Sequence, residues 1–126
     1  MSYHESICIL TVDDHKIFRE GLAMVLATQP DVNLVAQASN GWEAIQQFRQ
    51  HHPDITLMDL QMPEMNGLDA MVAIRKEFPE AKIIILTTYE SDMQGLGVRA
   101  YLLKTRLDKE LLGTIRTVYS DGLKPS

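Results

Sequence analysis

Short apolar runs alternate along this chain with segments in which apolar residues recur every three or four positions. The runs are mostly β-branched and bounded by polar residues, a pattern typical of strands that are buried on both faces. We therefore expect five strands, at Ser6–Val12, Val32–Ala38, Asp54–Met58, Ala81–Thr87 and Arg99–Leu103.

The segments between these runs carry apolar stripes at helical spacing. The stripes comprise Ile17, Phe18, Leu22, Val25 and Leu26; Ala44, Ile45 and Phe48; Leu68, Met71, Val72 and Ile74; and Leu107, Leu111, Ile115 and Val118. Capping residues support the helices, because an Asn or Thr stands three positions before an acid at Asn40–Glu43, Asn66–Asp69 and Thr105–Asp108. Helical segments are followed by Pro30, Pro53 and Pro79, which cannot continue a helix.

Alternating strands and helices with short connections predict βαβ units, and hence an α/β fold with a parallel sheet wound on both faces. In such folds ligands bind beyond the carboxyl ends of the strands, near the point where the strand order reverses. The functional residues are therefore expected at this edge of the sheet.

Composition favours a single globular domain. The 126 residues are 45% apolar and 23% charged, and the net charge of −5 argues against a nucleic-acid or membrane surface on this domain. No apolar stretch approaches the ~20 residues that span a bilayer. The first residues lack a secretory signal pattern, so we expect a cytoplasmic protein with no membrane partner. The single Cys8 is expected to be a buried, inert thiol.

Polar residues stand at the carboxyl ends of four of the five expected strands. Asp13 and Asp14 end the first, Asp59 the third, Thr87 the fourth and Lys104 the fifth. Because parallel strands end at one edge of a sheet, these side chains should converge there. Neighbouring carboxylates repel one another unless a divalent cation or an ammonium group relieves them. Such a site suits a phosphoryl group, with a carboxylate as nucleophile.

Several longer motifs add a family resemblance. The stretches "LTVDDHKIFREGL", "ITLMDLQMPEMNGLDA", "IIILTTYE" and "AYLLKT" resemble the receiver domain of two-component response regulators, over nearly the whole chain. They are most similar to the NarL/FixJ subgroup, whose output domain is a LuxR-type helix-turn-helix. The resemblance implies a flavodoxin-like fold with five parallel strands in the order 2-1-3-4-5.

The resemblance also implies roles for individual residues. Asp59 would be the phospho-acceptor, receiving its phosphoryl group from a sensor histidine kinase. Asp14 and Asp59 would bind Mg²⁺ (or Mn²⁺) directly, Asp13 would act through water, and the backbone carbonyl of Gln61 would be a further ligand. Lys104 would be the ion-pair partner of the site.

Other positions would carry the signal. Thr87 would be the switch hydroxyl that moves to the phosphoryl group, and Tyr101 an aromatic switch. Gln61 and Tyr89 occupy positions that tune hydrolysis of the aspartyl phosphate, and Gly67 would let its loop turn tightly.

At the level of the whole protein, the resemblance implies a receiver at residues 1–119 and the start of a linker at 120–126. The missing output domain would bind DNA and regulate transcription. The receiver could form a homodimer through the face of its fourth helix, fifth strand and fifth helix, or through other helices. It would be a switch that catalyses only its own phosphorylation and dephosphorylation.

Three alternatives are weighed against this interpretation. A haloacid-dehalogenase-like phosphatase needs D-x-D at the nucleophile, but Asp59 is followed by Leu60 and Gln61. A flavodoxin-type FMN binder needs a phosphate loop after the first strand, where this chain has "DDHKIF". A stand-alone receiver that signals through protein contacts stays open.

Two features depart from the family pattern. The segment from Thr87 to Lys104 is shorter than in similar domains. Either its helix is shortened, or residues are missing from the printed chain. We favour the second interpretation. Lys104 is followed by Thr105 rather than by the Pro of many receivers.

Overall fold

The predicted parallel sheet is present in the computed structural model, which describes residues 6–93 and 100–120. Its five strands are β1 (Ile7–Val12), β2 (Val32–Ala38), β3 (Ile55–Asp59), β4 (Ile83–Thr87) and β5 (Tyr101–Leu103). They are all parallel and lie in the order β2-β1-β3-β4-β5, which confirms the predicted flavodoxin-like topology. The order reverses at β1, so the ends of β1 and β3 border the crevice where ligands of such sheets bind.

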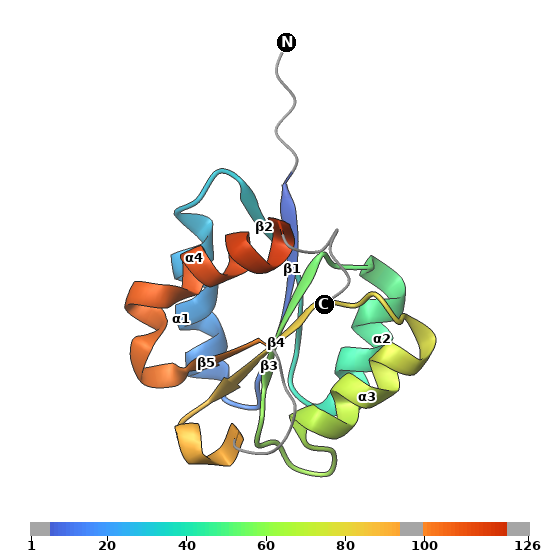
Figure 1. Cartoon of the computed structure of the whole chain (residues 1–126). Coiled ribbons are helices and arrows are strands. Elements are labelled where there is room, and N and C mark those ends of the chain that lie inside the picture. Colours follow the sequence, from blue (N-terminus) through green and yellow to red (C-terminus); the bar gives the residue numbers. More distant parts are fainter. Residues whose placement is uncertain (1–5, 94–99, 121–126) are drawn as a thin grey trace.

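Helices cover both faces of this sheet (Figure 1). On one face lie α1 (Lys16–Ala27) and α4 (Leu107–Ser120), and on the other lie α2 (Gly41–His51) and α3 (Gly67–Glu77). Two 3₁₀ helices complete the described elements, η1 (Glu90–Met93) and η2 (Lys104–Arg106). The helix α4 is the fifth helix of the prediction, because only η1 stands in the described part of the segment where the fourth was expected.

The core is divided by the sheet into two clusters, as alternation along buried strands requires. The cluster under α2 and α3 includes Leu10, Val12, Met58 and Ile85. The cluster under α1 and α4 takes the alternate positions, including Ile9, Leu57, Ile84 and Leu86. Because both faces of β1, β3 and β4 are packed, the carboxyl ends of these strands are held at fixed positions.

Two of the three predicted helix caps are confirmed. The side chain of Asn40 accepts a hydrogen bond from the backbone N–H of Glu43, and that of Asn66 accepts one from Asp69, each at 2.9 Å. The third is wrong, because Thr105 lies inside η2 and the chain enters α4 through this 3₁₀ turn.

The prediction for Cys8 needs correction. Cys8 is only partly buried, although burial and the neighbouring Asp54 raise the pKa of its thiol and so keep it protonated. The interpretation that residues are missing after Thr87 concerns a segment that the structure does not describe, so it stays a prediction. The Gln94–Gly97 junction, Arg99 and the tail after Ser120 lie outside the described residues.

Candidate functional site

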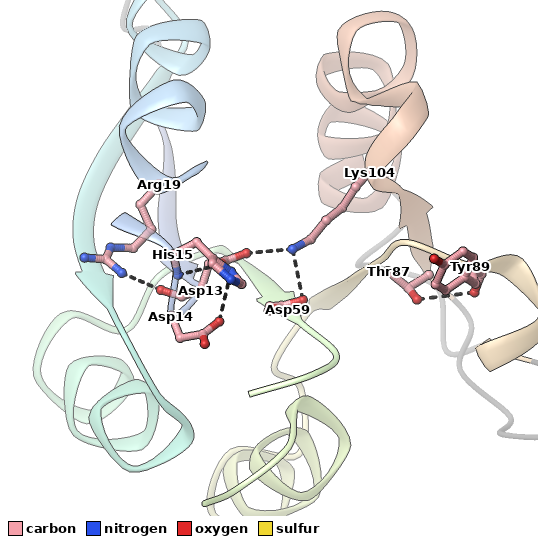
Figure 2. A network of polar contacts seen from close by, with 8 residues as sticks. All are labelled: Asp13, Asp14, His15, Arg19, Asp59, Thr87, Tyr89 and Lys104. Atoms are coloured by element: carbon pink, nitrogen blue, oxygen red, sulfur yellow. Dashed lines mark hydrogen bonds and ion pairs between the residues drawn. The ribbon is translucent and has the colours of Figure 1, made fainter. Parts of the chain in front are cut away.

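The strand ends bring an ammonium group between two buried carboxylates. Asp13 follows β1, Asp59 ends β3 and Lys104 follows β5. The Lys104 Nζ lies 3.0 Å from Asp13 Oδ2 and 3.2 Å from Asp59 Oδ1 (Figure 2). The two acids are 0% and 4% exposed, so this ion pair is largely screened from water. The convergence that the sequence predicts for these three residues is confirmed.

The loop after β1 is held by hydrogen bonds that Asp13 makes with residues of β2, α1 and the loop itself. The backbone N–H of Asp13 donates to the carbonyl of Ala38 at 3.1 Å, and its carbonyl accepts from Arg19 Nη1 at 2.5 Å. Its Oδ1 accepts the backbone N–H of His15 at 2.8 Å. The His15 Nδ1 lies 3.1 Å from Asp13 Oδ1 and 3.2 Å from Asp14 Oδ1, so the second acid also faces the site (Figure 2).

The turn after β3 places Asp59 through a close backbone approach. The Leu60 N–H donates to the carbonyl of Leu86, and the Gly67 N–H donates to the carbonyl of Leu60. A Cβ on Gly67 would lie 2.2 Å from the Asp59 carbonyl oxygen and 3.1 Å from the Leu60 Cα. A side chain at this position would therefore displace the backbone of the acid itself, which explains the glycine at the end of "MPEMNG".

A small hollow of about 90 Å³ opens beside Asp59. Its walls are His15, Asp59, Leu60, Gln61, Thr87, Thr88, Asp92 and Lys104. The predicted residues Gln61 and Thr87 therefore border the same space as Asp59 and Lys104. Asp92, on η1, is a wall residue that sequence reasoning missed, because the fold of the shortened segment could not be predicted.

The hydroxyl of Thr87 is engaged away from Asp59. Its Oγ1 donates to the Tyr89 carbonyl at 3.3 Å, and the backbone N–H of Asp92 donates to the same carbonyl at 3.1 Å. Figure 2 shows Thr87 and Tyr89 apart from the cluster of acids. Tyr101, unlike Thr87, is not a wall residue of the hollow, and its hydroxyl donates to Glu90 Oε1 at 3.2 Å.

Charge and burial act together on the titration of this site. Burial raises the pKa of Asp59, the charge of Asp13 raises it further, and Lys104 only partly offsets both. Burial lowers the pKa of Lys104, but its hydrogen bond to Asp13 and the charge of Asp59 outweigh that effect, so the pKa stands above its usual value. Lys104 therefore stays protonated at neutral pH, and the site holds an excess of carboxylates, because Asp13, Asp14 and Asp59 lie beside this one ammonium group.

This excess fits a divalent cation. Ligand atoms of Asp13, Asp14, His15 and Asp59 all lie within 4.8 Å of one another. Carboxylate oxygens are the donors that Mg²⁺ prefers. A larger hollow of about 520 Å³ lies away from these acids, between the ends of α2 and α3, and the converging charges favour the smaller one as the functional site.

Comparison with known proteins decides the family. The model of the response regulator receiver domain matches residues 9–116. This chain belongs to that family. Receiver domains bind Mg²⁺ in an acidic pocket, and the acids of this receiver form such a cluster.

The curated relatives of this receiver include oxygen regulatory proteins. The receiver is 42% identical over 117 residues to the oxygen regulatory protein NreC of Staphylococcus haemolyticus (strain JCSC1435), and 40% identical to NreC of Staphylococcus epidermidis (strain ATCC 12228 / FDA PCI 1200). Each match covers 88% of this chain and 54% of the relative. The chain thus spans about half the length of these curated relatives.

Solved structures agree with the subgroup. A LuxR-family response regulator from Aurantimonas sp. SI85-9A1 has a TM-score of 0.85 and 31% identity, covering 92% of this chain and 86% of that one. A LuxR-family DNA-binding response regulator from Staphylococcus aureus has a TM-score of 0.79 and 28% identity, covering 90% and 98%. The predicted receiver domain of a NarL/LuxR-type response regulator is therefore confirmed.

Proposed function

We propose that this receiver accepts a phosphoryl group on Asp59 from the phosphohistidine of a sensor kinase, and so switches a DNA-binding output domain. The observation that carries the proposal is the setting of Asp59. Its buried carboxylate lies 3.2 Å from Lys104, borders a small hollow and has Asp13 and Asp14 beside it. A buried nucleophile, a fixed cation and room for a small group are what phosphoryl transfer requires.

The transfer step makes one bond and breaks one. A carboxylate oxygen of Asp59 forms a bond to phosphorus, the P–N bond of the phosphohistidine breaks, and the departing imidazole nitrogen keeps the electron pair and takes up a proton. The ammonium of Lys104 stabilises negative charge on the phosphoryl oxygens. Dephosphorylation is the attack of water on phosphorus, which returns the Asp59 carboxylate and inorganic phosphate.

The metal is assigned to residues of the acidic cluster. Asp14 and Asp59 would hold Mg²⁺ (or Mn²⁺) directly, Asp13 would hold it through water, and the backbone carbonyl of Gln61 would be the remaining protein ligand. When bound, the ion supplies positive charge to the phosphoryl oxygens.

Asp14→Ala should weaken Mg²⁺ binding by about tenfold or more, which a fluorescence titration measures. Unchanged affinity would contradict this ligand set, and Asp69→Ala, at an exposed acid of α3, is the control.

The switch follows from the bonds that Thr87 and Tyr101 make. On phosphorylation the Thr87 hydroxyl leaves the Tyr89 carbonyl and binds a phosphoryl oxygen. That carbonyl keeps the Asp92 N–H, so it still has a hydrogen-bond partner after Thr87 leaves. Tyr101 then breaks its hydrogen bond to Glu90, and the movement of its side chain changes the face formed by η1, β5 and α4. Inverting a 1:99 population takes about 5.5 kcal/mol of differential binding, and charge-assisted hydrogen bonds provide much of it.

The output is assigned from the relatives. The receiver comprises residues 1–119, and 120–126 begin a linker to an output domain. Because this chain carries a net charge of −5, DNA contact belongs to that domain rather than to the receiver. A homodimer through the face of η1, β5 and α4 would bring two output domains together. We place the protein in the cytoplasm; no described helix is long and apolar enough to cross a membrane.

Acetyl phosphate and Mg²⁺ provide the test. Intact-mass measurement should show one added phosphoryl group on the wild-type chain and on Asp69→Asn, and none on Asp59→Asn. Equal addition to wild type and Asp59→Asn would end the assignment of the acceptor. Failure of the wild type to take up any phosphoryl group would contradict the proposed function as a whole.

A further inference from the structure

Lys104 has a third neighbour that the proposed chemistry does not use. Its Nζ lies 4.4 Å from the centroid of the Phe18 ring, in addition to its contacts with Asp13 and Asp59. The side chain is 19% exposed, so the ring and the two acids leave little room for water around the ammonium. The three contacts come from three elements: α1, the end of β1 and the end of β3.

Phe18 is itself fixed by the fold. It is half-buried on α1 and packs against the cluster that also contains Leu22, Leu26 and Leu111. The ring is therefore held in a fixed position beside the ammonium. The face of an aromatic ring attracts a cation through its quadrupole, and the attraction is stronger when the pair is shielded from water.

We propose that Phe18 is a positioning residue for Lys104, which holds the ammonium toward Asp59 through its aromatic face. The inference rests on the proposed function, since Lys104 is the group that meets the phosphoryl oxygens. A lysine side chain loses rotamer freedom when it is fixed, and this loss costs free energy. The ring offsets part of this cost before the donor arrives, so the charge is already in place when negative charge develops.

A pair of substitutions separates the aromatic face from mere bulk. Phe18→Leu keeps an apolar side chain but removes the quadrupole, and Phe18→Tyr keeps the ring. With acetyl phosphate and Mg²⁺, Phe18→Leu should lower the maximal phosphorylation rate about 3- to 10-fold, while Phe18→Tyr stays within about twofold of wild type. Leu22→Val, a packing change in the same cluster, should not slow the reaction. A normal rate in Phe18→Leu, or equal rates in the two Phe18 variants, would overturn the proposal.

A second measurement does not depend on phosphorylation. In a double-mutant cycle, Phe18→Leu and Lys104→Met are combined, and the unfolding equilibrium constant of each variant is measured in urea. The two sites should be coupled by about threefold or more in that constant. Additive effects would refute the contact. If the wild type takes up no phosphoryl group but the coupling is present, the proposed function fails and the positioning contact stands.

Discussion

Asp13 is the residue with the most defined surroundings in the site. Its N–H, its carbonyl and both carboxylate oxygens each have a partner, and these include Arg19 and Lys104. Asp59, the proposed acceptor, lies beside it with the Lys104 ammonium on one oxygen. Asp13 thus orders the first loop and helps to hold Lys104, so that Asp59 can meet a donor in a prepared environment.

Two buried threonines differ from Asp13, because their hydroxyls lack hydrogen-bond partners in the described part of the chain. Among the described residues, the hydroxyls of Thr11 and Thr56 are buried without a hydrogen-bond partner. A buried hydroxyl without a partner costs about 1–3 kcal/mol. Thr56→Val should therefore leave stability unchanged or raise it by up to about 1 kcal/mol in urea unfolding. Thr56→Ser, which keeps the hydroxyl and removes the methyl group, should lower stability, and a loss in both variants would show that the hydroxyl is satisfied.

At the scale of the elements, the β3–α3 connection is the part most sensitive to a small change. Gly67→Ala places a methyl group against the backbone of Asp59 and Leu60, which can move only by shifting the site. We expect a loss of about 1–3 kcal/mol in unfolding free energy, together with slower phosphorylation.

Gly113 on α4 provides the matched control. An added Cβ there meets nothing within 4 Å, so Gly113→Ala should stabilise the helix by about 0.5–1 kcal/mol. Calorimetry of both variants tests the pair. A stable Gly67→Ala that is phosphorylated at the normal rate would contradict the close approach.

The last helix is also tied to the β2 side of the sheet through Arg116. Its guanidinium donates to both oxygens of Asp31 and to Gln29 Oε1, and this bond lowers the pKa of Asp31 below its ordinary value of 3.8. An acid with a lowered pKa stabilises the fold above its unfolded pKa and loses that contribution as the pH falls through its folded pKa.

Arg116→Gln should therefore be less stable than wild type at neutral pH. Thermal melts recorded between pH 7 and pH 2 should converge as Asp31 becomes protonated, at and below pH 3.8. A difference that stays constant across this range would assign the effect of Arg116 to packing rather than to the ion pair.

At the scale of the whole molecule, the sequence predicts the frame of the site better than its details. Asp13, Asp59 and Lys104 could be placed together because parallel strands end at one edge, and each strand end was visible as the close of an apolar run. The roles of Arg19 and Phe18 could not be predicted, because they depend on how α1 packs against the sheet. Asp92 was missed for a similar reason, since the segment after Thr87 departs from the family pattern.

The helices that cover the sheet also limit how a change at the site can reach the rest of the receiver. Both faces of the sheet are covered by helices, so a change at the site must be transmitted through the strand ends and the loops that follow them. Thr87 and Tyr101 belong to the neighbouring strands β4 and β5, and both are bonded to the segment that contains Tyr89 and Glu90. We therefore propose this segment as the link between the acids and the face of η1, β5 and α4.

Locating the phosphoryl group in the chain tests the central claim most directly. The wild-type chain is treated with acetyl phosphate and Mg²⁺, the acyl phosphate is reduced with borohydride, and the modified residue is identified by peptide sequencing in a mass spectrometer. The account predicts one modified residue, Asp59. Modification at Asp13, at Asp14 or at a residue outside the hollow, with Asp59 intact, would contradict it.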